Sequence, residues 1–87
     1  MAVDFPTRPD FRHDLAGSHH NLGLLLRATG RLKEAEAAYR EAVEIRKQLA
    51  VDFPTRPDFR QELALTQNNL GNLLYTTARL AETEAAY

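Results

Sequence analysis

The stretch NLGLLLRATGRLKEAEAAYREA, residues 21–42, holds two helix-forming segments separated by a break at Gly30. Upstream of the break, apolar residues recur at steps of three and four from Phe11 to Thr29, which is the period of an amphipathic helix. A glycine at the break can adopt the left-handed conformation that ends many helices. A second amphipathic segment begins near Leu32. The stretch therefore predicts a helical hairpin.

Each predicted helix has one apolar face. The first helix is expected from about Pro9 to Thr29, and the second from Leu32 to Phe53, because a residue before a proline is disfavoured in the α region. The predicted packing face of the first helix consists of Phe11, Leu15, Ser18, Leu22, Leu25, Leu26 and Thr29. That of the second consists of Ala35, Ala38, Tyr39, Ala42, Val43, Arg46, Leu49 and Phe53, with the aliphatic stem of the arginine filling a gap.

The chain repeats itself with a shift of 48 residues. The segment AVDFPTRPDFR stands at Ala2–Arg12 and again at Ala50–Arg60. Between Ala2–Tyr39 and Ala50–Tyr87, 26 of 38 positions are identical. Internal repetition with a period of this length is the signature of stacked repeat architectures.

The repeat also sets the expected domain organisation. We expect one array over residues 1–87, in which unit one covers about 7–54 and an incomplete unit two covers about 55–87. Residues 2–5 then correspond to the tail of a preceding helix. No segment alternates as a strand would, so the predicted fold class is all-α.

Composition excludes several function classes. A net charge of −1 provides no basic surface for nucleic acid or anionic lipid. The absence of cysteine excludes disulfides and thiolate chemistry. The longest apolar run, Leu24–Leu26, is too short to span a bilayer or to serve as a signal-peptide core, so we expect a soluble, cytoplasmic protein.

The pattern N-L-G-x-x-L, followed by G, A, Y and A at fixed spacing, resembles the tetratricopeptide repeat. Its residues here are Leu22, Gly23, Gly30, Ala35, Tyr39 and Ala42, with Leu70 and Gly71 in the second copy. The long period is similar to that of kinesin light chains and many bacterial arrays. The resemblance implies a right-handed α-solenoid of antiparallel helix hairpins that acts as a non-catalytic scaffold for protein or peptide partners.

Gly23 and Gly71 lie inside predicted helices, where glycine costs about 1 kcal/mol relative to alanine. This cost is explained if a neighbouring helix approaches closely at these positions. Ala35, Ala38 and Ala42 provide a matching small surface on the second helix.

The second hairpin departs from this pattern. Ala78 stands where the first copy has Gly30, and Thr83 stands where it has Ala35. Without glycine, the left-handed turn is disfavoured by roughly 1 kcal/mol. We predict that this turn is weakly specified and opens into one long helix.

In arrays of this family, partners usually bind the concave surface lined by the leading helix of each hairpin. The predicted partner-binding residues here are His20, Leu24, Arg27, Leu65, Asn68, Asn72 and Tyr75. The two copies differ most on this face, whereas the connector is identical. The alternative is that these positions are exposed to solvent and vary in sequence because no contact constrains them.

Three other readings of the residues are weaker. A carboxylate clamp, known in the family, requires lysines that this face lacks, although Asn69 and Asn72 match clamp positions. His13, His19 and His20 do not have the spacing of a convergent metal site. No nucleophile–base pair or phosphate loop is evident, so we predict no catalytic residue, no cofactor and no metal.

Self-association is the competing function. Both ends of the array are expected to expose apolar surface, at Phe5 and Phe11 on one side and at Leu80 and Tyr87 on the other. A homo-oligomer that stacks end to end, or swaps its last helix, would cover these residues.

Overall fold

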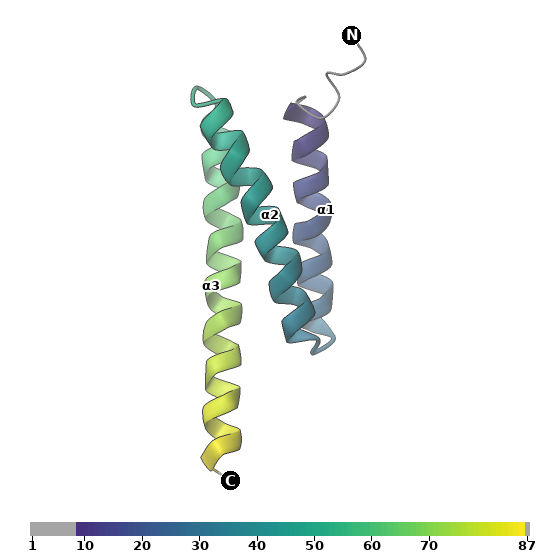
Figure 1. Cartoon of the computed structure of the whole chain (residues 1–87), viewed down its shortest axis with the longest axis vertical. Coiled ribbons are helices and arrows are strands. Elements are labelled where there is room, and N and C mark those ends of the chain that lie inside the picture. Colours follow the sequence, from purple (N-terminus) through teal and green to yellow (C-terminus); the bar gives the residue numbers. More distant parts are fainter. Residues whose placement is uncertain (1–8, 87) are drawn as a thin grey trace.

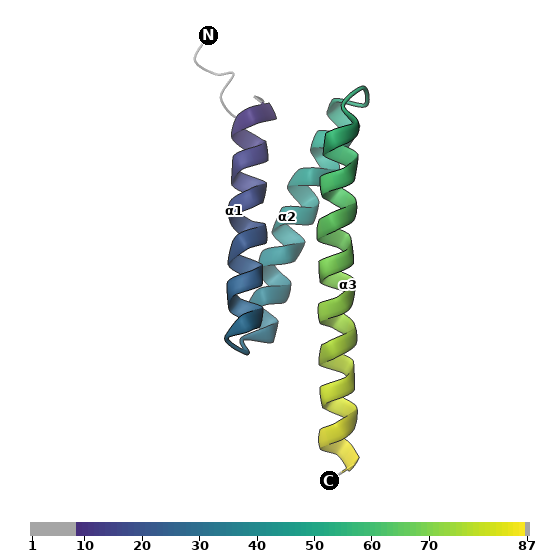
Figure 2. The ribbon, with the colours of Figure 1, turned by 180° about the vertical axis from the view of Figure 1, so that it is seen from behind.

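Three helices form the structure. The computed structural model describes the backbone of residues 9–86 and the side chains of residues 9–84. Helix α1 covers Pro9–Ala28, α2 covers Leu32–Asp52 and α3 covers Pro57–Ala86. Figures 1 and 2 show that α1 and α3 run in the same direction in one layer, while α2 runs against them in a second layer. No strand occurs between residues 9 and 86, and the all-α prediction is confirmed.

The turn between α1 and α2 depends on Gly30. Its φ of 82° is in the left-handed region, as expected for a glycine after a helix. Arg31 N donates to Leu26 O at 2.8 Å, and Gly30 N donates to Arg27 O at 3.0 Å. This pair of hydrogen bonds is the Schellman arrangement, which satisfies the last carbonyl groups of α1 and reverses the chain.

At Gly23, α1 and α2 approach each other closely. A Cβ atom placed on it would lie 2.6 Å from Tyr39 Cε1 and 2.7 Å from Tyr39 Cδ1, which is too close for real atoms. The Tyr39 ring is fully buried. The close approach predicted for this glycine is confirmed. The one predicted for Gly71 is wrong, since a Cβ there meets nothing within 4 Å among the described residues, because no helix lies against that face of α3.

Helix α2 packs on both of its neighbours and contributes most of the core. Its buried residues are Ala35, Ala38, Tyr39, Ala42, Arg46 and Leu49, all of them on the predicted face. Two of them, Ala35 and Tyr39, form a cluster with Leu73 of α3, against which Leu26 and Leu70 pack. The core thus joins the first hairpin to the third helix.

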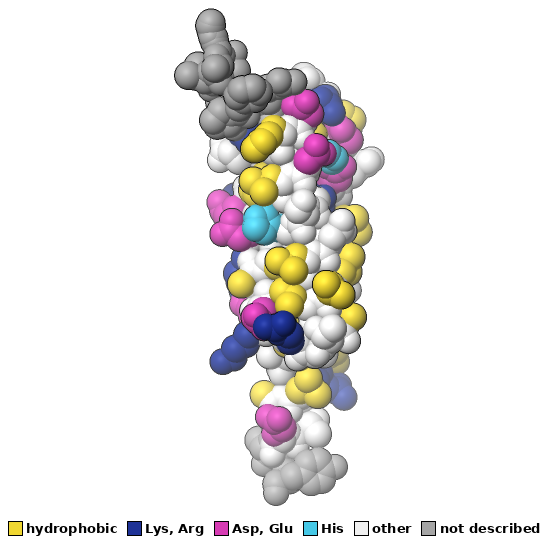
Figure 3. Space-filling model, turned by 90° about the vertical axis from the view of Figure 1, so that its right-hand side faces the viewer, with side chains coloured by type: hydrophobic (Ala, Val, Ile, Leu, Met, Phe, Trp, Pro, Cys, Tyr) yellow, Lys and Arg dark blue, Asp and Glu magenta, His cyan; other side chains and the backbone are white. Residues whose placement is uncertain are grey.

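The packing face predicted for the first helix is wrong for α1. Six of its seven residues, which we call the α1 stripe, are exposed: Phe11, Leu15, Ser18, Leu22, Leu25 and Thr29. Their repeat counterparts, the α3 stripe, are all buried or half-buried: Phe59, Leu63, Thr66, Leu70, Leu73 and Thr77. The difference arises because α3 lies against α2 through this stripe, whereas no helix within residues 9–86 covers the stripe on α1. Figure 3 views the molecule from the α1 side, where apolar side chains gather along the surface.

Instead, α1 meets the core through Ala16, His20 and Gly23, all of which are buried. The counterparts of these residues on α3, which are Ala64, Asn68 and Gly71, are exposed. Each of the two equivalent helices therefore packs through the face that the other leaves open.

Helix α3 runs without interruption through residues 77–80, so the predicted opening of the second turn is confirmed. Its last turns extend beyond the α1–α2 turn (Figure 1). Leu80 and Phe11 are about half exposed, in agreement with the expected apolar ends, while Phe5 and Tyr87 lie outside the described residues.

Replacement of Gly23 by alanine tests the contact with Tyr39. We expect Gly23→Ala to destabilise the fold by about 1–2 kcal/mol, because the clash with a buried ring exceeds the gain in helix propensity. Gly17→Ala is the matched control on the same helix, since a Cβ there meets nothing within 4 Å among the described residues. It should stabilise by about 0.5–1 kcal/mol. Chemical denaturation followed by circular dichroism measures both, and equal effects of the two changes would contradict this account.

Candidate functional site

Parallel α1 and α3 present a surface away from α2. Leu65 and Tyr75 on α3 are 53% and 64% exposed, and Leu24 on α1 is 45% exposed. Asn68 and Asn72 are also exposed. Six of the seven predicted partner-binding residues are at least partly accessible, and we call these six the α1–α3 face: Leu24, Arg27, Leu65, Asn68, Asn72 and Tyr75.

The side chain of Tyr75 is held by its neighbour on α3. Arg79 Nη1 donates to the Tyr75 hydroxyl at 3.1 Å, and its guanidinium carbon lies 5.8 Å from the centre of the ring. The ring is exposed but not isolated. An aromatic group held in one position loses little conformational entropy when it binds a partner.

His20, the seventh predicted residue, differs from the others. Only 7% of it is exposed, and its ring lies edge-on to Tyr39 with the ring centres 5.7 Å apart. His20 Nδ1 lies 3.1 Å from Thr66 Oγ1, and Asn69 Nδ2 lies 3.2 Å from His20 Nε2. The prediction that this side chain faces a partner directly does not match its position, because it is buried between α1, α2 and α3.

Arg46 completes this buried group, which we call the polar junction: His20, Arg46, Thr66 and Asn69. Arg46 Nη1 donates to Thr66 Oγ1 at 2.6 Å and to Glu62 O at 3.3 Å. Thr66 in turn donates its own hydroxyl to Glu62 O at 3.1 Å. The junction links all three helices through polar contacts, and hydrogen bonds are what make such burial tolerable.

The hydrogen-bond partners of His20 determine which of its ring nitrogens carries the proton. An amide nitrogen can only donate, so His20 Nε2 accepts from Asn69 and Nδ1 carries the proton that is donated to Thr66. Burial lowers the pKa of His20 below its ordinary value of 6.5, and the charge of Arg46 lowers it further. His20 is therefore neutral in the folded protein near pH 7.

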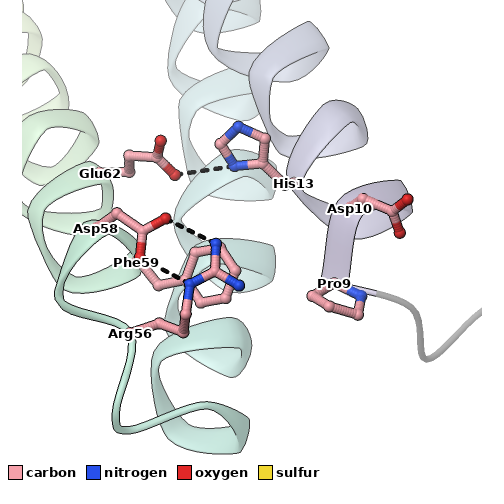
Figure 4. A pocket seen from close by; sticks show the side chains of 7 residues that line it. All are labelled: Pro9, Asp10, His13, Arg56, Asp58, Phe59 and Glu62. Atoms are coloured by element: carbon pink, nitrogen blue, oxygen red, sulfur yellow. Dashed lines mark hydrogen bonds and ion pairs between the residues drawn. The ribbon is translucent and has the colours of Figure 1, made fainter.

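A pocket of about 230 Å³ lies between the starts of α1 and α3. In Figure 4, His13 points toward Glu62, with Nδ1 and Oε1 2.9 Å apart. Arg56 donates to Asp58 and stacks over Phe59, its guanidinium carbon 4.3 Å from the ring centre. The His13–Glu62 contact therefore joins α1 to α3, whereas Arg56 and Asp58 pair locally at the start of α3.

The histidines separate into different environments. His13 faces Glu62, His20 belongs to the polar junction, and His19 is half-buried on α1. In the part of the chain that the structure describes, no three histidine, aspartate or glutamate side chains gather as metal ligands. Asn69, one of the two clamp-position asparagines, is engaged with His20.

The polar junction was not predicted as a unit. Its one sequence signal is the occurrence of a polar residue in each of two apolar stripes, Thr66 on α3 and Arg46 on α2. Periodicity assigns each to a packing face but does not show that the two faces meet.

An antiparallel hairpin followed by an equivalent third helix is the architecture of a helical-repeat protein. Residues 15–55, which span most of α1 and all of α2, match the family model described as tetratricopeptide repeat. This segment is a tetratricopeptide repeat, as its sequence resemblance indicated. No curated protein and no solved structure matches the chain. Among residues 9–86, no helix is both long enough and apolar enough to cross a bilayer.

The lowered pKa of His20 predicts a loss of stability in acid. The unfolded chain takes up a proton on His20 more readily than the folded chain, so its stabilising contribution is present above pH 6.5 and is lost as the pH falls below that value. For one group the slope is at most about 1.4 kcal/mol per pH unit. Unfolding free energies of the parent chain, measured from pH 7.5 to 5, should show this decline.

His20→Asn places the residue of the second copy at this position and should flatten the decline. His19→Gln, which also copies the second unit, is the matched control and should leave the decline unchanged. A decline of the same size in all three chains would show that His20 does not cause it.

Proposed function

We propose that the chain is a non-catalytic scaffold that binds a protein or peptide partner through the α1–α3 face. Tetratricopeptide repeats are helical scaffolds that often mediate protein interactions, and residues 15–55 match that family. The observation that carries the proposal for this face is the exposure of Leu24, Leu65 and Tyr75, because large side chains on one accessible surface indicate a binding site.

The positions of these residues along the two helices support a continuous surface. The contacts of His20 with Thr66 and Asn69 fix the level at which α1 lies beside α3. The two helices run in the same direction (Figure 2). Leu24 and Asn72 are each about one turn further along the chain than these contacts, so helix geometry puts them at neighbouring levels. An extended or helical peptide would contact both helices there.

The chemistry of the face favours a partner with apolar anchors. Its side chains are two leucines, a tyrosine, two asparagines and one arginine, which provide apolar contact with amide hydrogen bonds beside it. With a net charge of −1 for the chain, nucleic acid and membrane surfaces are not part of the proposal. A cytoplasmic location and the absence of catalysis belong to the same proposal.

A second function, self-association, is favoured by a different observation. The α1 stripe carries four large apolar side chains that are each at least 43% exposed. Leu80 adds exposed apolar surface at the opposite end of the fold. A homo-oligomer through such surfaces is the alternative to a separate partner.

Peptide selection tests binding at the α1–α3 face. Peptides selected from a displayed random library against the chain should lose affinity about tenfold or more for Tyr75→Ala, as expected for removal of a central aromatic anchor. Lys47→Ala, an exposed change on α2, is the control and should bind equally well. Fluorescence anisotropy gives both affinities. Selected peptides that bind the parent and Tyr75→Ala chains with one affinity would rule out this face.

A further inference from the structure

The spacing of the α1 stripe is that of a helix-pairing seam. Its residues follow one another at steps of 4, 3, 4, 3 and 4 from Phe11 to Thr29. This alternation places one residue on the same side of the helix at every turn and defines the a and d positions of a coiled coil. Over 18 residues, the seam is about 27 Å long.

The two polar members of the seam are already satisfied. Ser18 Oγ donates to Asp14 O at 3.2 Å, and Thr29 Oγ1 donates to Leu26 O at 3.0 Å. Both acceptors are backbone carbonyl groups of the same helix. Covering the seam would therefore leave neither hydroxyl without a hydrogen bond, so the whole stripe behaves as an apolar surface.

The repeat shows what kind of neighbour such a seam accepts. The equivalent α3 stripe packs against α2, which is antiparallel to it, with Phe59 and Leu73 almost fully buried. On α1 the same positions hold Phe11 and Leu25, which are 54% and 61% exposed. The neighbour that covers this pattern of side chains on α3 is thus the face of the antiparallel α2 that carries Ala35 and Tyr39.

We infer that two copies of the chain pair through their α1 stripes as an antiparallel, two-fold symmetric helix dimer. The inference rests on self-association, the second proposed function, and specifies its surface. The stripe lies on the side of α1 away from the buried Ala16, His20 and Gly23. Its first residues, Phe11 and Leu15, border Glu44, Ile45 and Gln48 of α2, so α2 of each copy flanks the seam.

The side chains define one register. With the two-fold axis midway between Ser18 and Leu22, Ser18 faces Leu22 of the second copy. Leu15 then faces the second copy's Leu25, and Phe11 faces its Thr29. Two of these three pairs oppose a large and a small side chain, which is how seams interdigitate.

The charges beside the seam are compatible with this register. Arg12 and Asp14 flank it on opposite sides. In the antiparallel pair Arg12 lies at the level of Ala28 of the second copy, and Asp14 at the level of its Leu26. Because Leu26 and Ala28 are uncharged, neither Arg12 nor Asp14 is placed against a like charge on α1 of the second copy.

A pair of exposed leucines provides the decisive variants. Leu25 is in the seam and is 61% exposed, whereas Leu24 belongs to the α1–α3 face and is 45% exposed. Because both side chains are exposed, we expect glutamate at either position to leave the fold intact, and circular dichroism will verify this. Sedimentation velocity over a concentration series should give the parent chain a mass approaching twice 9.8 kDa. Leu25→Glu should weaken the dimer by more than about tenfold, because it places a charge in an apolar seam. Leu24→Glu should dimerise like the parent.

Each other outcome overturns the inference. A parent chain that stays monomeric to millimolar concentration shows that the α1 stripe does not pair with a second copy. A dimer that survives Leu25→Glu leaves self-association intact but places it elsewhere, and one lost only in Leu24→Glu places it on the α1–α3 face. Loss of the seam dimer leaves the peptide-binding proposal standing, because its anchors are outside the seam, whereas a dimer on the α1–α3 face would compete with the peptide.

Cross-linking tests the register itself. The chain has no cysteine, so single substitutions give unambiguous disulfides. A mixture of Ser18→Cys and Leu22→Cys chains should form a cross-linked heterodimer under mild oxidation. The control mixture of Ser18→Cys with Leu24→Cys pairs positions of the same exposure, since Leu22 and Leu24 are both 45% exposed. Equal yields from the two mixtures would overturn the antiparallel register.

Discussion

The ring of Tyr39 packs directly on the backbone at Gly23, and the distance between α1 and α2 depends on this contact. It brings α1 close to α2 at one side of the ring, while Leu73 of α3 joins the same cluster. A single aromatic side chain thus connects the hairpin to the next helix. Because α2 is the shared neighbour, its small residues determine how near the other two helices can come, and the exposed α1–α3 face is the consequence of that arrangement.

The polar junction adds specificity to this apolar framework. Arg46 and His20 are both buried, and each makes hydrogen bonds to Thr66. A sliding of α3 along the hairpin would break these contacts and leave a buried guanidinium unpaired, which is costly. The junction therefore fixes the level of α3 relative to α1.

Helix boundaries, the left-handed Gly30 and the close approach at Gly23 could all be predicted from local chemistry. The continuation of α3 through Ala78 was predictable for the same reason, since an alanine does not favour the left-handed turn. The burial of His20 was not. A helical wheel places it opposite the apolar stripe, but its surroundings include Thr66 and Asn69, which are more than forty residues away in sequence. Contacts of that range are decided by how helices stack, and periodicity carries no information about the stacking.

The two copies of the repeat separate what sequence determines from what tertiary structure decides. Sequence by itself determined that each leading helix has two faces able to pack, one through its apolar stripe and one around its glycine. Tertiary structure alone decided which face is used: α3 buries its stripe against α2, and α1 buries its glycine face against the same helix, where Tyr39 contacts both. Leucines at equivalent positions of the repeat, such as Leu25 and Leu73, are exposed in one copy and buried in the other. The physical reason is that burial depends on whether a neighbouring helix is present, and α2 is the helix that both copies share.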